Sequence, residues 1–302
     1  MAVMDNMLDT PVLLITFIRP DHTRRALNAI REQKPKRLYV GQDGPREGRQ
    51  DDVAKLQAVR AVVDELVDWD CELHTLYQEK NLGCGRGPYE AMSWFFQNEE
   101  KGIVLEDDIN PHPLFFPYME DLLERYMNDN AVGMVTAHNL QRYYSSKNSY
   151  YFTYEMAGTL GWGTWRRVWE KFDFDIPFDP EVLGGSLKKY GMPRLCRKMT
   201  VNNYKKWLSR DRHDCWDYQF DYYLLVNHYL NARANSCLTS HEGDDGDATH
   251  SEYSNPGYSM EVNVPLFETI SHPDKVKVDS SVKWRMWKRE AHCVINKLMK
   301  HD

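Results

Sequence analysis

The feature that most constrains this chain is a short apolar run followed directly by three carboxylates, Ile103-Val104-Leu105-Glu106-Asp107-Asp108. The apolar run favours a strand that is buried on both faces, as in a parallel sheet covered by helices. Such a strand ends at the carboxyl edge of the sheet, where open α/β sheets bind their ligands. Three acids at that edge repel one another unless a cation or a polyhydroxyl ligand compensates their charge. The run therefore predicts a ligand site that involves a metal ion.

A second interpretation of the same acids is the start of a helix. Asp108 would then be the N-cap residue, with Pro111 and Pro113 in the first helical turn. A cap needs one acid and this chain has three in a row, so the ligand site is the favoured interpretation.

Strands and helices are expected to alternate at short spacing over about residues 10–137. Expected strands are 12–17, 37–40, 71–77, 103–105 and 132–135, and expected helices are 22–33, 51–68, 88–97 and 115–127. This alternation predicts an α/β fold with a mostly parallel sheet and helices on both faces. Right-handed crossovers place the loops that follow the strands at one edge. Asp43, the glycine loop 81–87 and the three acids are therefore expected to converge.

The sequence changes in character beyond residue 140. It continues with an aromatic stretch, a loop-like segment 158–165 that turns helical through 171, a helix near 200–209, an aromatic helix 214–229 and an acidic loop 243–251. We expect residues 1–140 and 141–260 to be the two halves of one domain. Residues 261–302 form a C-terminal extension with a basic amphipathic helix.

Composition excludes several classes of protein. The net charge of −7 and the pI near 5.9 argue against a general nucleic-acid binder. The six cysteines are scattered and show no CxxC spacing, which disfavours a zinc site or a disulfide framework and fits a reducing compartment. No signal peptide or membrane span is evident, so a cytoplasmic protein is expected. The basic, aromatic tail 282–300 could lie on an anionic membrane surface or pack on its own domain.

Several motifs in order resemble a known family. Glu106-Asp107-Asp108 after a strand, Thr16-Phe17-x-Arg19-Pro20 and the Asp43 turn resemble the GT-A nucleotide-sugar glycosyltransferases. The likeness is greatest to the N-acetylglucosaminyltransferase I-like branch, which has a Glu-Asp-Asp version of the Asp-x-Asp motif. Asn81-Leu82-Gly83, Leu160-Gly161-Trp162 and Trp216-Asp217 are also similar, and segments 216–219 and 246–250 resemble bacterial haemolysin-like glycosyltransferases.

The resemblance, which spans about residues 10–255, implies a GT-A fold with an acceptor-side C-terminal part and a metal-dependent, inverting enzyme. The donor would be a UDP-sugar and the acceptor a glycan or lipid-linked glycan, as in bacterial surface polysaccharide synthesis. Mn²⁺ or Mg²⁺ would be the cofactor. Asp108 would bind the metal, and His250 would approach the metal or the diphosphate.

The resemblance also implies roles for the remaining positions. Glu106 and Asp107 would contact ribose and sugar hydroxyls, and Asp43 would bind uracil beside Thr16 and Arg19. Asp217 would be the general base, although the animal enzymes carry a second Asp where this chain has Tyr218, which leaves Asp221 and Asp245 as candidates.

Three further positions have plainer alternatives. Glycine-loop backbone N–H groups near Asn81, with Arg86, could hold phosphate, or the loop could be an ordinary turn. Trp162, with Trp165, could be a platform for a sugar ring, or both could be core residues. His250 could equally be an exposed loop residue.

Two other functions remain open from the sequence. A sugar nucleotidyltransferase would share the fold, metal and acids, but it would want a glycine-rich, basic signature near the first strand, which 15–22 lacks. A non-catalytic glycan- or nucleotide-binding protein is disfavoured by the intact acids 106–108 and Asp217.

Overall fold

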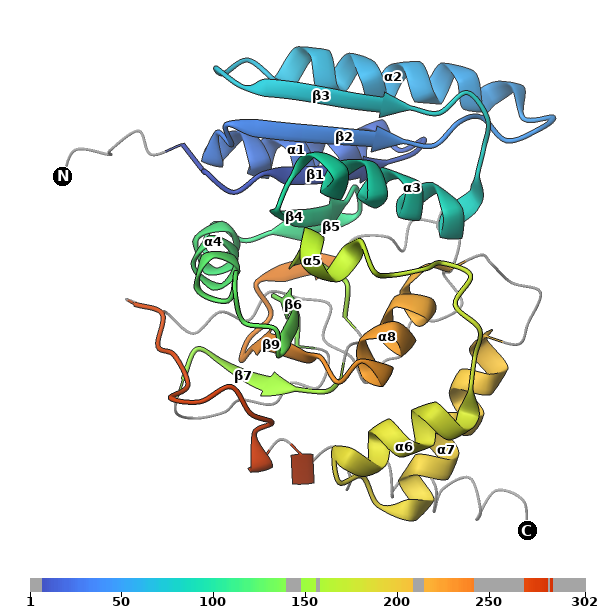
Figure 1. The fold of residues 1–302 in the computed structure, drawn as a ribbon. Coiled ribbons are helices and arrows are strands. Elements are labelled where there is room, and N and C mark those ends of the chain that lie inside the picture. The colour runs from blue at the N-terminus through green and yellow to red at the C-terminus, as the bar shows by residue number, and fades with distance from the viewer. Residues whose placement is uncertain are drawn as a thin grey trace, which may run out of the picture.

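Four parallel strands form the first half of the central sheet. The computed structural model describes residues 7–139, 148–155, 158–208, 215–241, 269–281 and 283–284. Within them, neighbouring strands pair in the order β3-β2-β1-β4 (Figure 1). Their bounds are β1 (Val12–Thr16), β2 (Arg37–Gln42), β3 (Glu72–Tyr77) and β4 (Lys101–Glu106).

The sheet continues without a break into the second half of the chain. The added strands are β6 (Val132–Thr136), β7 (Tyr150–Thr153), β8 (Trp162–Trp165) and β9 (Leu230–Ala234). They extend the order to β3-β2-β1-β4-β8-β6-β9-β7, in which β8 and β7 run antiparallel to their neighbours. The structure thus confirms the predicted α/β class with a mostly parallel sheet.

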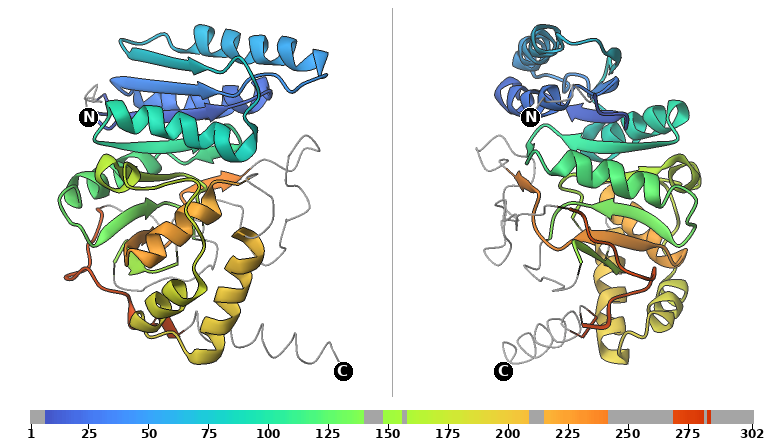
Figure 2. Two further views of the ribbon diagram at one scale, coloured as in Figure 1. Left: turned by 45° about the vertical axis from the view of Figure 1, so that its right-hand side comes forward. Right: turned by 90° about the vertical axis from the view of Figure 1, so that its left-hand side faces the viewer.

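Helices cover both faces of the sheet (Figures 1 and 2). Helices α1 (Pro20–Gln33) and α2 (Gln50–Leu66) lie on one face, and α3 (Gly83–Asn98) lies on the other. Right-handed crossovers require this change of face, because the chain moves outward from β1 to β3 and then returns to β4. Apolar side chains recurring at helical spacing in α2, Leu56, Val59 and Val63, are buried against this sheet.

The remaining elements pack around the second half. They are α4 (Phe115–Arg125), α5 (Arg166–Trp169), α6 (Pro180–Lys189), α7 (Arg194–Leu208), α8 (Asp217–Val226) and a two-stranded sheet of β5 (Ile109–Pro111) and β10 (Thr239–His241). Helix α6 was not expected from the sequence. It begins at an Asp179 side chain that accepts hydrogen bonds from two backbone N–H groups, which is ordinary N-capping.

The segment 158–165 corrects a sequence prediction. It was expected to be loop-like, but its last four residues form β8 between β4 and β6. Both tryptophans of β8, Trp162 and Trp165, are fully buried. Gly163 permits this close packing, since a Cβ there would lie 2.7 Å from the carbonyl oxygen of Gly102. Gly163, one of the glycines that suggested a loop, is thus needed for contact between strands.

A second correction concerns the end of the aromatic helix. The helix was expected to run through Tyr229, but α8 ends at Val226, and His228 adopts a positive φ of 62°. This turn sends the chain back into the sheet as β9, which pairs with β6 in parallel. Among the described residues no helix is long and apolar enough to cross a membrane.

Packing between β4 and α3 gives a test of the fold. A Cβ at Gly102 would lie 2.2 Å from the Phe95 ring, so Gly102→Ala should overpack this contact and cost about 1–3 kcal/mol of unfolding free energy. Gly185→Ala in α6 is the control, because nothing lies within 4 Å of its Cβ, and it should be neutral or gain up to about 1 kcal/mol. Chemical denaturation measures both, and equal stabilities would contradict the packing described.

Candidate functional site

The three acids lie at the carboxyl end of β4, as the sequence predicted for that strand. Arg19, which follows β1, reaches across and forms ion pairs with Asp107 and with Asp108, the latter at 3.0 Å. The backbone N–H of Phe17 also donates to Asp107, at 3.4 Å. Because β1 and β4 are adjacent parallel strands, their ends deliver one cation and three carboxylates to the same point. The site is thus built by the loops of neighbouring strands.

Crowding of like charges shifts the pKa values of these acids. Burial, and then the charges of its neighbours Asp108, Asp107 and Asp217, raise the pKa of Glu106. Burial also raises the pKa of Asp107 to about 6, against the opposing effect of Arg19. Glu106 keeps part of its side chain exposed, so solvent screens some of the repulsion. The acids together exceed the positive charge that Arg19 supplies.

Asp108 behaves differently from its two neighbours. Burial acts to raise its pKa, but interactions with His241 and Arg19 outweigh burial and lower the pKa to about 2. His241 lies 3.5 Å from Asp108 because β10 pairs with β5 and sets His241 opposite Ile109. The alternative in which Asp108 caps a helix is wrong, since residues 109–111 form β5 and α4 begins only at Phe115.

Helix α8 brings two further acids toward the cluster. Asp217 is half-buried at the first position of α8, and its charge contributes to the raised pKa of Glu106. Asp221, one turn further along, is buried, and burial followed by the charge of Asp217 raises its pKa well above the usual range. A role for Asp221 as the general base stays a prediction.

Asp43 occupies a different part of the same edge. Its carboxylate accepts hydrogen bonds from the backbone N–H groups of Gly44, Leu82 and Gly83 at 2.8–3.1 Å. The Asn81 amide also donates to it, at 3.0 Å. These hydrogen bonds use the acceptor positions of both carboxylate oxygens and link Asp43 to the glycine loop. Asp43 therefore holds the loop in place in this structure, and contact with a base stays a prediction.

The other predicted contacts have protein partners as well. The Thr16 hydroxyl is buried and donates to the Gly41 carbonyl oxygen at 3.3 Å. Arg86 forms an ion pair with Asp175 at 3.0 Å and lies over the Phe174 ring. The roles assigned to Thr16, Asn81 and Arg86 in ligand binding stay predictions.

The platform role of Trp162 is wrong. Its side chain is fully buried and stacks on Trp216, with ring centroids 5.3 Å apart, so neither face can receive a sugar. Core packing, the alternative interpretation, describes Trp165 as well. His250 and Asp245 lie outside the described residues, as does most of the tail 282–300.

No ready-made metal centre is seen in the described part of the chain, where no three His, Cys, Asp or Glu side chains are grouped to hold an ion. The residues nonetheless fit a hard divalent cation in two respects. Their donors are carboxylate oxygens, which Mg²⁺ and Mn²⁺ prefer, and their charge is in excess. Mg²⁺ can be held by one or two carboxylates when a substrate phosphate supplies further oxygens.

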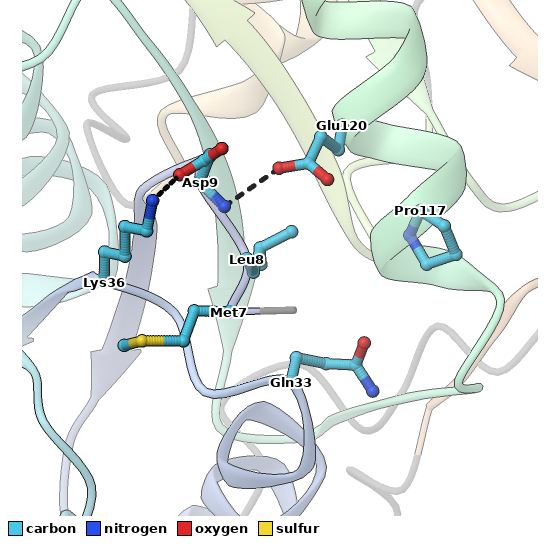
Figure 3. A pocket seen from close by; sticks show the side chains of 7 residues that line it. All are labelled: Met7, Leu8, Asp9, Gln33, Lys36, Pro117 and Glu120. Atoms are coloured by element: carbon cyan, nitrogen blue, oxygen red, sulfur yellow. Dashed lines mark hydrogen bonds and ion pairs between the residues drawn. The ribbon is translucent and has the colours of Figure 1, made fainter. Parts of the chain in front are cut away.

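The pocket shown in Figure 3 lies away from these acids. Its lining comes from the opposite edge of the sheet, from the segment before β1, the end of α1 and one side of α4. Asp9 forms an ion pair there with Lys36, and the Asp9 backbone N–H donates to Glu120 at 3.0 Å. The charged groups of this pocket therefore have partners within the pocket. The carboxyl edge of the sheet, with its excess of negative charge, is the stronger candidate for the functional site.

Comparison with known proteins gives only distant likenesses. No protein-family model matches the chain, and no curated protein matches it. Among solved structures, an apo UDP-glucose pyrophosphorylase has a TM-score of 0.42 and 9% identity over 75% of this chain and 90% of its own. An inositol-1-phosphate CTP transferase from T. maritima has a TM-score of 0.36 and 9% identity over 76% and 85%.

A third solved structure is similar over a shorter stretch. It is 4-diphosphocytidyl-2C-methyl-D-erythritolsynthase from Anaerococcus prevotii, with a TM-score of 0.35 and 9% identity over 57% of this chain and 79% of its own. TM-scores below 0.5 at such identity do not identify the reaction of this chain.

The names of these proteins nevertheless correct one expectation. The sequence predicted a glycosyltransferase with a UDP-sugar donor, whereas the matching structures are a pyrophosphorylase, a CTP transferase and a nucleotide-conjugate synthase. The predicted enzyme class is thereby contradicted. These likenesses do not test the inverting mechanism, the glycan acceptor or the general-base role of Asp217, which stay predictions.

Asp43 gives a test of the loop geometry. Asp43→Asn replaces one accepting oxygen by an NH₂ group that faces backbone N–H donors, which should cost about 1–3 kcal/mol of unfolding free energy. The control is Asp51→Asn at an exposed position of α2. Chemical denaturation measures the stability of the two variants. A D43N protein as stable as D51N would show that the hydrogen bonds of Asp43 do not hold the glycine loop.

Glu106 gives a test of the charge crowding. Because the pKa of Glu106 is raised in the folded state, the folded protein keeps a proton that the unfolded chain loses above about pH 4.5. The stability of the wild type should therefore fall as pH rises toward the raised pKa. Glu106→Gln cannot ionise and should avoid this loss, so its melting temperature should exceed that of the wild type by several degrees at about pH 8.5, without divalent cations.

At about pH 5 the advantage of the Glu106→Gln variant should shrink, because Glu106 in the wild type is then protonated. Glu47→Gln, in an exposed turn, is the control and should show no such trend. A melting difference that is the same at both pH values would remove the crowding argument.

Proposed function

We propose that this protein is a nucleotide-sugar-binding transferase that acts by nucleotidyl transfer with a divalent cation. In this reaction a sugar phosphate and a nucleoside triphosphate give a nucleotide sugar and pyrophosphate. The observation that carries the proposal is the Arg19 bridge to Asp107 and Asp108, between the ends of two parallel strands. It places a fixed cation and an acid pair where an α/β sheet binds phosphorylated ligands.

Excess negative charge supports a role for a divalent cation. Asp108 and Asp107 would hold the cation, with Glu106 and Asp217 close enough to feel their charge. Bound there, the cation would neutralise the polyphosphate and act as a Lewis acid. Without a cation these acids repel one another. A bound cation would compensate that repulsion, which accounts for three consecutive acids at this position.

Arg19 would change partners when substrate binds. A cation on the acids replaces the need for the Arg19 ion pairs, which frees the guanidinium for a phosphate. Arginine suits this role, since its planar fork binds phosphate as well as carboxylate in two-point contacts. Arg19 would thus supply the basic group that a nucleotidyltransferase needs after its first strand.

Nucleotidyl transfer also fits the protonation states of the site. The attacking atom is an oxygen of the sugar phosphate, which is already anionic at neutral pH. It forms a bond to the α-phosphorus of the triphosphate while the bond to pyrophosphate breaks, and no proton has to move. The reaction therefore needs positioned charges and no general base.

One observation favours a simpler second candidate, which is nucleotide binding without catalysis. Arg19 already satisfies Asp107 and Asp108, and the described residues hold no group of three metal ligands. A protein that only binds nucleotide sugars would show the same ion pairs. The experiment below separates the two candidates.

The test is a pyrophosphate-release assay with the full chain, Mg²⁺ or Mn²⁺, each nucleoside triphosphate and a panel of sugar 1-phosphates. We expect release with one pair of substrates, and a loss of at least 100-fold in rate for Asp108→Asn or Arg19→Gln, on the scale of single electrostatic contacts in catalysis. Arg24→Gln is the matched control, because Arg24 is an exposed arginine of α1 that pairs with Glu65.

Isothermal titration calorimetry of nucleotide sugars with the same proteins completes the test. Cation-dependent binding without pyrophosphate release would overturn the reaction and leave the binding candidate. No binding of any nucleotide by the folded protein would overturn both. Release of a nucleoside diphosphate in place of pyrophosphate would contradict nucleotidyl transfer.

A further inference from the structure

The segment from the end of α6 to the end of α7 is strongly basic in a chain that is acidic as a whole. Residues 188–208 contain no Asp or Glu, whereas the whole chain has a net charge of −7. We call its basic residues the cationic face, and they are Lys188, Lys189, Arg194, Arg197, Lys198, Lys205 and Lys206. Such a concentration of one sign creates a local positive potential that the net charge conceals.

Helix α7 directs most of these side chains to solvent. Arg194, Lys198 and Lys205 are exposed, and their spacing of four and seven residues places them on one side of the helix. The other side is buried through Cys196 and Tyr204, and Tyr204 packs edge-on against Trp207. The helix is therefore held by its apolar side, and its basic side faces solvent.

The charges of the cationic face lack acidic partners among the described residues. Elsewhere on the surface, Arg24 pairs with Glu65 and Arg31 pairs with Asp68. No ion pair joins any member of the cationic face to a described acid. Unneutralised charges of one sign repel one another, so an external anion would stabilise this face.

Exposed apolar side chains adjoin the charges. Leu195 is 56% exposed on α7 and Val182 is 48% exposed on α6. Trp284, which is 64% exposed, follows Lys283, whose ammonium group lies against Gly191 in the turn between α6 and α7. Figure 1 shows this late segment beside α6 at the end of the molecule away from β3. Cations, an indole and aliphatic groups thus share one surface.

We propose that the cationic face, with Leu195 and Trp284, docks this protein on an anionic phospholipid bilayer. Lysine and arginine side chains are attracted to anionic headgroups, and indole and aliphatic groups enter the headgroup region beside them. A polyanion such as DNA would use the charges and leave the apolar groups exposed to water. The bilayer is favoured because it matches both kinds of side chain.

Docking would leave the candidate site open to solvent. Helices α6 and α7, which carry the cationic face, lie at one end of the molecule, away from β1 and β4 (Figures 1 and 2). Arg19 and the acids follow β1 and β4. This inference is independent of the proposed reaction, since it concerns different residues.

The test is sedimentation of the full chain with phosphatidylcholine vesicles, with and without about one-third phosphatidylglycerol. We expect binding to the anionic vesicles only, weakened by salt. Reversal of three charges, Lys198→Glu, Lys205→Glu and Lys206→Glu together, should reduce partitioning by at least 100-fold, at about fivefold for each charge neutralised and more for each charge reversed. Trp284→Ser should weaken binding without changing its salt dependence.

The matched control reverses three basic residues, Arg25 in α1, Arg49 just before α2 and Lys55 in α2, and should bind vesicles like the wild type. Melting temperatures confirm that each variant is folded. Equal vesicle binding by the two triple variants would overturn the proposal, as would binding of double-stranded DNA more tightly than of anionic vesicles. Loss of vesicle binding leaves pyrophosphate release unaffected, so the two proposals fail separately.

Discussion

The balance of charge at the end of β4 governs the rest of this structure. Three consecutive acids can be held at the edge of a sheet only if something positive meets them, and here that is Arg19 from the neighbouring strand. The pairing ties the β1 loop to the β4 loop, and through His241 it also ties in the short β5–β10 sheet. Burial, together with the negative charge that Arg19 does not neutralise, raises the pKa of Glu106 and of Asp107. In the proposed function, a divalent cation would compensate this excess of negative charge.

Local patterns were sufficient to predict the first half of the fold. Apolar runs such as 103–105 and helical spacing in α2 report burial directly, and handedness then fixes which face each helix covers. The second half could not be predicted in the same way, because its strands are determined by partners that are distant in the sequence. A loop is the natural prediction for residues 162–165 from sequence alone. Their strand conformation becomes evident only when β4 and β6 are known to lie on either side of them.

The same distinction applies to the candidate site. The acids 106–108 were found because the chain itself places them after a buried strand. Arg19 was singled out, but its pairing with those acids needs the adjacency of β1 and β4. His241 was missed altogether, since only the pairing of β10 with β5, about 130 residues apart, brings it to Asp108. Trp162 shows the opposite error, because aromatic residues near a site are more often core than contact.

The place of β8 in the sheet has a consequence for biosynthesis. Residues 7–106 contain β1 to β4 with their helices, and the pairings of β1 with β2, β2 with β3 and β1 with β4 all lie within this stretch, so this part can begin to fold while the ribosome is still adding the rest. Until Trp162 to Trp165 emerge, however, one edge of β4 has no partner, and its unpaired backbone N–H and C=O groups are a template for pairing with other nascent chains. The late arrival of one four-residue strand thus sets the interval during which a newborn molecule is exposed to misassembly.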